Sequence, residues 1–115
     1  MPTQRHCYAL DLRDDPDLIA QYRQHHAPGQ VWPAVIERIR AAGIVDMQIY
    51  LSGNRLMMIM ETDERFDPQT KAAMDAANPD VQAWEALMSQ FQQALPWAAP
   101  GQKWVPMEQI FQLGA

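Results

Sequence analysis

The chain has 115 residues, 48% of them hydrophobic, which is the usual size of one domain with its own core. Nine Lys and Arg residues stand against fourteen Asp and Glu residues, and the net charge of −5 disfavours nucleic acid or an anionic membrane as a partner. We therefore expect a single domain over residues 1–115 with neither kind of partner.

Location and cysteine chemistry follow from short segments. The longest hydrophobic run, residues 56–60, is far below the roughly 20 residues of a transmembrane helix. The first twelve residues lack the apolar segment and cleavage site of a signal peptide, so we expect a cytoplasmic protein. Cys7 is the single cysteine, which excludes an intramolecular disulfide and a thiolate-rich zinc site. We interpret it as a small buried residue of a strand.

The first half of the chain predicts a strand, two helical segments and a hairpin. Residues 5–12 alternate as a half-buried strand does. Asp15 and a following proline start a helix that we expect over about residues 16–27, and a second helical segment covers residues 33–43. Residues 44–62 flank a Ser-Gly-Asn-Arg turn and predict a β-hairpin.

A two-residue turn fixes the register of this hairpin, because side chains alternate between the faces of a sheet. The predicted apolar face consists of the pairs Leu51 and Leu56, Ile49 and Met58, and Met47 and Met60. The other face is mixed and carries Tyr50, Met57 and Ile59 among polar neighbours.

The second half predicts a short helix near residues 68–77, a longer helix over 79–95 and a last strand over 107–113. The order βαββαβ is typical of an α+β, ferredoxin-like fold, an antiparallel sheet with helices on one face. The mixed face of the hairpin then needs a cover. We expect a homodimer whose sheets pack face to face as a dimeric α+β barrel.

Two aromatic pairs are candidates for ligand binding. Tyr22 and His26 lie four residues apart and share a helix face, and an imidazole exchanges protons near neutral pH. Trp84 and Trp32 can form a platform for a sugar or another ring. The alternative is that all four are core residues.

Two acidic residues are candidate partners of these aromatic side chains. Glu61 and Glu85 are the candidate carboxylates, although each can equally be a solvated charge. The three histidines lack metal-ligand spacing, and no phosphate loop or serine-hydrolase elbow is present. The sequence therefore gives no support to a metal, nucleotide or serine-hydrolase site.

The segment Tyr22-Arg23-Gln24-His25-His26, followed by Pro28 and Trp32-Pro33, resembles the Tyr-x-x-x-His motif of the L-rhamnose mutarotases and their relatives assigned to L-fucose. The hairpin and the helix bearing Trp84 extend the similarity over nearly the whole chain. The resemblance implies an isomerase that interconverts the α and β anomers of a 6-deoxy-L-hexose by general acid and base catalysis, without a cofactor. It implies His26 as proton donor and Tyr22 as a contact to the sugar.

Three departures from the rhamnose enzymes concern the expected pocket. Gly29-Gln30 is an insertion, Met47 replaces a sugar-binding tyrosine, and Trp84-Glu85 replaces a Trp-Trp pair. L-Fucose and L-rhamnose therefore both stay candidates, with Trp84 as platform and Glu61 or Glu85 as base. Two rival functions use the same architecture: a heme-degrading type of monooxygenase, and a non-catalytic dimeric module that binds a small ligand.

Overall fold

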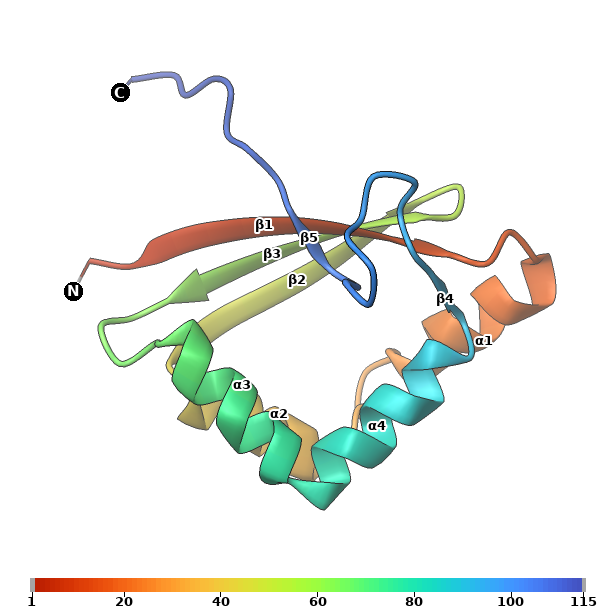
Figure 1. Ribbon diagram of the computed structural model, residues 1–115, viewed down its shortest axis with the longest axis horizontal. Coiled ribbons are helices and arrows are strands. Elements are labelled where there is room, and N and C mark those ends of the chain that lie inside the picture. The colour runs from red at the N-terminus through yellow and green to blue at the C-terminus, as the bar shows by residue number, and fades with distance from the viewer. Residues whose placement is uncertain (1, 115) are drawn as a thin grey trace.

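The computed structural model describes residues 2–114. Helices cover one side of an antiparallel sheet, and the other side carries none of them (Figure 1). The elements in chain order are β1 (Gln4–Leu12), α1 (Pro16–His25), α2 (Pro33–Ala41), β2 (Ile44–Ser52), β3 (Arg55–Thr62), α3 (Pro68–Ala77), α4 (Pro79–Ser89), β4 (Gln92–Gln93) and β5 (Val105–Pro106). No helix within this part of the chain is long and apolar enough to cross a membrane.

The strands run in the order β2-β3-β1-β4, and β5 also pairs with β1. This is the order of a ferredoxin-like sheet and confirms the α+β prediction. The predicted hairpin register is confirmed as well, since Leu51 lies opposite Leu56, Ile49 opposite Met58 and Met47 opposite Met60. The turn residues therefore decide which methionines face the helices.

Helix starts agree with the sequence, whereas three helices end earlier than expected, among them α2, which ends at Ala41 rather than near residue 43. The Asp15 carboxylate accepts hydrogen bonds from the first turn of α1, and the Asn78 side chain does the same for α4. However, α1 ends at His25 rather than near residue 27, and α4 ends at Ser89 rather than at residue 95. The prediction for α4 was too long because Phe91 and Leu95 enter the same core from non-helical backbone, where β4 pairs with the end of β1.

The predicted strand at residues 107–113 is wrong. Pairing with β1 occurs earlier, at Val105 and Pro106, and the last bond runs from the Met107 amide to the Cys7 carbonyl, at 2.8 Å. Residues 107–113 then extend away from the helices with no strand partner among residues 2–114 (Figure 1). Their apolar side chains satisfy a strand pattern, but the described chain offers them no surface to cover.

The core lies between the sheet and the helices. Its buried side chains come from β1, β3, α1, α2 and α4 and include Leu12, Leu56, Tyr22, Val35, Trp84 and Met88. A second, smaller cluster around Ile44 and Met60 fills the end of the sheet near Phe66. The opposite sheet face is open, and Tyr50 there is 53% exposed. Helix packing thus places one sheet face in the interior and leaves the other available.

Candidate active site

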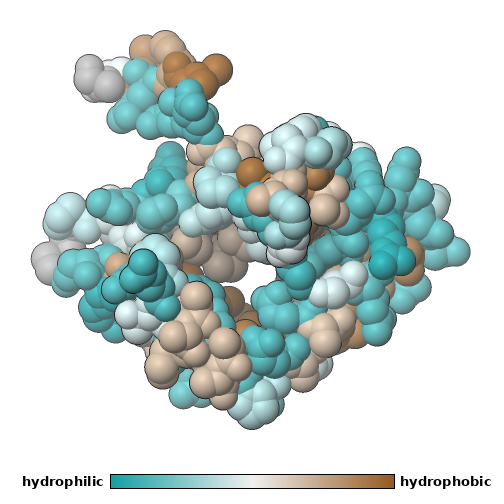
Figure 2. All heavy atoms as spheres, viewed as in Figure 1, coloured by the Kyte–Doolittle hydropathy of each residue, from teal (hydrophilic) through white to brown (hydrophobic). Residues whose placement is uncertain are grey.

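A cavity of about 750 Å³ lies between the sheet and the helices. Figure 2 shows it as a hollow through the middle of the molecule. The residues around it include Tyr22 and His26 at the end of α1, Met47 on β2, Met58 and Met60 on β3, and Trp84 and Glu85 on α4. Apolar side chains with a few polar groups are the usual lining of a small-molecule site.

The Tyr22–His26 pair is confirmed as one contact. Spacing of four residues brings the two rings to 4.4 Å between centroids, at a tilt of 33°. The His26 Nδ1 lies 2.8 Å from the Tyr22 carbonyl oxygen. Because a carbonyl only accepts, Nδ1 carries the proton and the neutral ring keeps a lone pair on Nε2. The helix end therefore fixes the tautomer of a histidine that lines the cavity.

Burial decides the charge of both side chains. It lowers the pKa of His26 below its ordinary value, and it raises the pKa of Tyr22 to about 12. At neutral pH the cavity therefore contains an uncharged imidazole that can accept a proton and a phenol that keeps its own. This combination provides a general base beside a hydrogen-bond donor.

The two tryptophans have different positions. Trp84 lines the cavity, with its ring edge-on to His26 at 5.6 Å between centroids. Trp32 packs edge-on against Trp84 at 5.2 Å and is not among the residues that line the cavity. Trp84 is thus placed to meet a ligand, and Trp32 to hold Trp84.

The two candidate carboxylates are also separated. Glu85 lines the cavity and forms an ion pair of 3.4 Å with Lys103. Glu61 lies on the sheet face away from the helices, where it accepts hydrogen bonds from Thr3 and Arg5. The structure brings Glu85 to the His26 site and leaves Glu61 outside it.

The His25 side chain, next to His26 in the chain, is half-buried. Its ring lies 5.5 Å from that of Phe91 and 6.4 Å from that of Trp84. The His25 ring therefore lies against α4 and against Phe91, which follows shortly after its end.

Several lining residues were missed in the sequence. Tyr8, Arg38, Lys71, Asp75 and Trp104 all reach the cavity. Tyr8 shares the helix-facing side of β1 with Leu10 and Leu12, which is a signal that the alternation contained. No cluster of three or more His, Cys, Asp or Glu side chains within residues 2–114 is arranged to hold a metal ion.

Comparison with known proteins identifies this architecture. The family model for L-rhamnose mutarotase matches residues 5–113. The chain belongs to the L-rhamnose mutarotase family. It is also 53% identical, over 98% of its length and 90% of the relative's, to a protein of Xanthomonas campestris pv. campestris named L-fucose mutarotase. A UPF0734 protein of Dictyostelium discoideum is 35% identical over 91% of this chain and 86% of its own.

A solved structure agrees on the fold. The crystal structure of an L-rhamnose mutarotase from Formosa agariphila superposes with a TM-score of 0.69 at 19% identity, covering 96% of this chain and 98% of that one. Mutarotases are isomerases, so membership of the L-rhamnose mutarotase family makes this protein an enzyme of that class. Neither rival function, the monooxygenase or the non-catalytic module, has support in these matches.

Proposed function

We propose that the protein exchanges the α and β anomers of a 6-deoxy-L-hexose, L-fucose ahead of L-rhamnose, with His26 as its proton-transfer group. The observation that carries this proposal is the His26 imidazole in the cavity beside Trp84, held there by the contact between its Nδ1 and the Tyr22 carbonyl oxygen. The 53% identity to a protein named L-fucose mutarotase supports the choice of sugar.

One imidazole is enough for the complete cycle. The Nε2 atom of His26 takes the proton of the anomeric hydroxyl, and the bond between C1 and the ring oxygen breaks to give the aldehyde. The ring oxygen leaves with the electron pair and receives the proton from the imidazolium. Rotation about the bond between C1 and C2 followed by the reverse steps forms the other anomer. His26 therefore acts first as base and then as the donor that the family resemblance implies.

The surrounding residues bind and orient the sugar. The Tyr22 phenol, protonated at neutral pH, donates a hydrogen bond to a hydroxyl group, and Trp84 contacts the apolar side of the ring. Trp32 supports Trp84, Met47 contacts the ring from β2, and Glu85 accepts a hydrogen bond. Mutarotation also proceeds slowly in water. A positioned acid–base group worth about a hundred to ten thousand fold is therefore a sufficient catalyst.

Saturation-transfer NMR at anomeric equilibrium tests the proposal. The protein is expected to transfer saturation between the two anomeric protons of L-fucose, and His26→Ala to reduce the added exchange rate by about a hundredfold or more. His25→Ala is the matched control, because His25 also packs on Trp84 but does not line the cavity. Exchange by His26→Ala at the parent rate would remove His26 from the mechanism.

We further propose that the protein acts as a cytoplasmic homodimer. The support for a dimer is the open sheet face around Tyr50 and Ile59, together with the exposed apolar side chains of the C-terminal segment 107–113. In the proposed dimer the open faces of two sheets pack together, and each C-terminal segment covers part of the partner. The cytoplasmic location stays a prediction from the sequence.

A further inference from the structure

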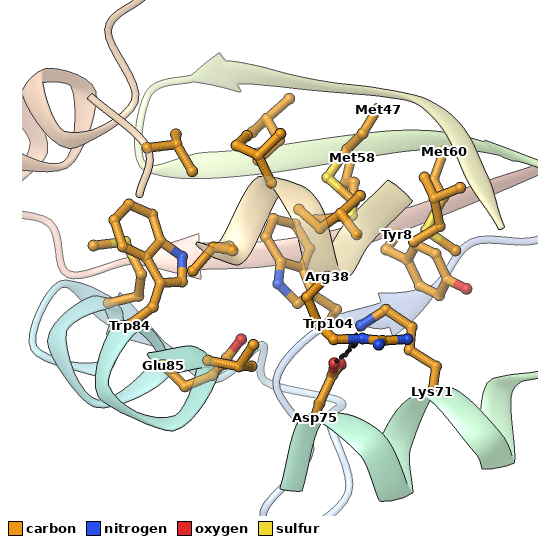
Figure 3. Close-up of a pocket in the computed structure, with 18 of the residues that line it drawn as sticks. Tyr8, Arg38, Met47, Met58, Met60, Lys71, Asp75, Trp84, Glu85 and Trp104 are labelled. Carbon is orange, nitrogen blue, oxygen red and sulfur yellow. Dashed lines mark hydrogen bonds and ion pairs between the residues drawn. The ribbon is translucent and has the colours of Figure 1, made fainter. Parts of the chain in front are cut away.

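We infer that Arg38 determines sugar specificity by donating hydrogen bonds to the hydroxyl at C4, and that Asp75 positions it. This inference rests on the proposed function and adds the groups that recognise the far side of the ring. Arg38 on α2 and Asp75 on α3 both line the cavity that contains His26. Figure 3 shows them together with Lys71 at the end of the cavity away from Trp84.

The guanidinium of Arg38 has donors to spare. Its side chain is only 17% exposed, and its Nε lies 3.8 Å from the Asp75 Oδ1, which is too long for a hydrogen bond. Both atoms are buried and lack a hydrogen-bond partner among residues 2–114. Arginine carries five N–H donors, and a buried donor without an acceptor costs free energy. The terminal nitrogens of Arg38 therefore have acceptors to gain from a ligand in the cavity.

The neighbouring charges restrain the Arg38 guanidinium without occupying its hydrogen-bond donors. The Asp75 carboxylate, 18% exposed, accepts a hydrogen bond from Lys71 one turn earlier on the same helix through Oδ2, and its Oδ1 faces Arg38. One carboxylate thus lies between two cations. Opposite charge restrains the guanidinium across the gap between α2 and α3, while the hydrogen-bond capacity of Arg38 stays unused.

The position of the reacting carbon at His26 determines which hydroxyl of the sugar lies nearest to Arg38. Proton transfer at His26 requires the anomeric carbon and the ring oxygen at the end of the cavity where His26 contacts Trp84. In a pyranose ring the hydroxyls at C3 and C4 lie across from the anomeric carbon, so they face the end formed by Arg38. L-Fucose and L-rhamnose have the same configuration at C3 and opposite configurations at C2 and at C4. The C2 hydroxyl adjoins the anomeric carbon, so of the two positions at which the sugars differ, C4 is the one that faces Arg38.

The test compares three sugars, L-fucose, L-rhamnose and 4-deoxy-L-fucose, on the parent protein and on Arg38→Met. We expect the parent to lose about tenfold or more in kcat/KM when the C4 hydroxyl is removed, since charge-assisted hydrogen bonds are the strong ones. In Arg38→Met, L-fucose and 4-deoxy-L-fucose should be exchanged equally well. The loss should appear in KM with kcat largely kept, because the C4 hydroxyl does not react.

Two further variants separate specificity from folding. Asp75→Asn should reduce the same discrimination between the sugars without removing Arg38. Arg23→Met, on the exposed side of α1, is the charge-matched control and should leave the discrimination between the sugars unchanged. A ratio between sugars does not depend on the fraction of folded protein, so a destabilised variant still gives an answer.

Each outcome bears on a different statement. A parent that exchanges L-fucose, with an Arg38→Met variant that keeps its preference for the C4 hydroxyl, would overturn the role of Arg38 and leave the mutarotase function intact. A parent that accelerates anomer exchange in none of the sugars would overturn the proposed function itself, and the role of Arg38 with it.

Discussion

The hydrogen bond between His26 and the Tyr22 carbonyl links a helix end to a protonation state. In the middle of α1 that carbonyl would bond the amide four residues later, but the helix stops at His25 and the imidazole reaches the carbonyl oxygen. Nδ1 is thereby occupied as a donor, and Nε2 is the atom left for the substrate. The end of the helix and the active tautomer are consequences of the same contact.

The pKa of His26 leads to a prediction on pH dependence. The neutral imidazole starts the cycle, so the kcat/KM for L-fucose should be constant around neutral pH and fall on acidification through the pKa of His26. Burial lowers that pKa, and the fall should therefore occur at a lower pH than an exposed histidine would show. Line-shape NMR corrected for exchange in buffer gives the profile.

Acid also acts on stability, with a known sign. Burial lowers the pKa of His26 in the folded protein below its value in the unfolded chain, so on acidification the unfolded chain binds a proton first. The contribution of His26 to the free energy of unfolding is therefore fully present above the unfolded pKa and is lost as the pH falls through the folded pKa. Tryptophan fluorescence recorded at each pH separates unfolding from loss of catalysis. An exchange rate that rises on acidification of the folded protein would show that the imidazolium is the active form.

Met47 gives a prediction on sugar preference. It lines the cavity where, by the family resemblance, the rhamnose enzymes have tyrosine, and a thioether cannot donate the hydrogen bond that a phenol gives. The parent should exchange the anomers of L-fucose faster than those of L-rhamnose. Met47→Tyr should reduce the ratio of these two exchange rates by about tenfold. Met58→Leu, which also changes a cavity methionine but adds no donor, is the control. A parent that prefers L-rhamnose tenfold would contradict this use of Met47.

Residue patterns predicted part of this site and missed the rest. Tyr22 and His26 share one helix, so their spacing alone determines their contact. Arg38 and Asp75 come from α2 and α3, and only the packing of those helices over the sheet brings them together. Glu61 was a plausible base by residue type, but its strand position places it on the opposite face. Local periodicity therefore identifies pairs within an element and not pairs between elements.

At the scale of elements, Gly43 joins α2 to β2 at a position that has no room for a side chain. Its φ is +94°, and a Cβ built there would lie 2.8 Å from both the Asp63 carboxylate and the Phe66 amide nitrogen. Gly43→Ala should therefore lower the free energy of unfolding by about 2 kcal/mol or more and Tm by about 8 °C. Thermal unfolding followed by circular dichroism measures the change.

Gly29 provides the matched control for this substitution. Its φ is +80°, but a Cβ there meets no atom of the described residues within 4 Å. Gly29→Ala should cost only the backbone term, about 1 kcal/mol. Equal losses in the two variants would show that the contacts with Asp63 and Phe66 are not limiting.

Elements were predictable where capping or turn chemistry marks them. Asp15 caps the helix that it was expected to start, and the Gly53-Asn54 turn sets the register that the apolar alternation requires. The end of α4 was not predictable, because Phe91 and Leu95 keep helical spacing after the helix has stopped. A single capping residue marks where a helix starts, whereas the end of a helix and the pairing of an edge strand depend on the elements packed next to them.

At the scale of the whole molecule, the two-layer arrangement of sheet and helices leaves two apolar surfaces exposed in the described part of the chain. One is the open sheet face, and the other is the apolar side of the C-terminal segment, where Ile110 is 89% exposed. Figure 1 shows that this segment extends away from the helices, on the side of the sheet that they leave open. Its strand-like pattern, which failed within one chain, is explained if a second copy supplies its contacts.

A homodimer therefore makes a prediction about charge on the open face. Ile59 on β3 lies in the strip with Tyr50, and Ile59→Lys would bury an unpaired ammonium group between the two sheets. The parent should sediment as a dimer at micromolar concentration, and Ile59→Lys as a monomer or an aggregate. Ala20→Lys, an added charge on the exposed side of α1, is the control and should stay dimeric. Deletion of residues 107–113 should weaken the dimer in the same measurement, whereas a parent that sediments as a monomer would show that both surfaces are tolerated in water.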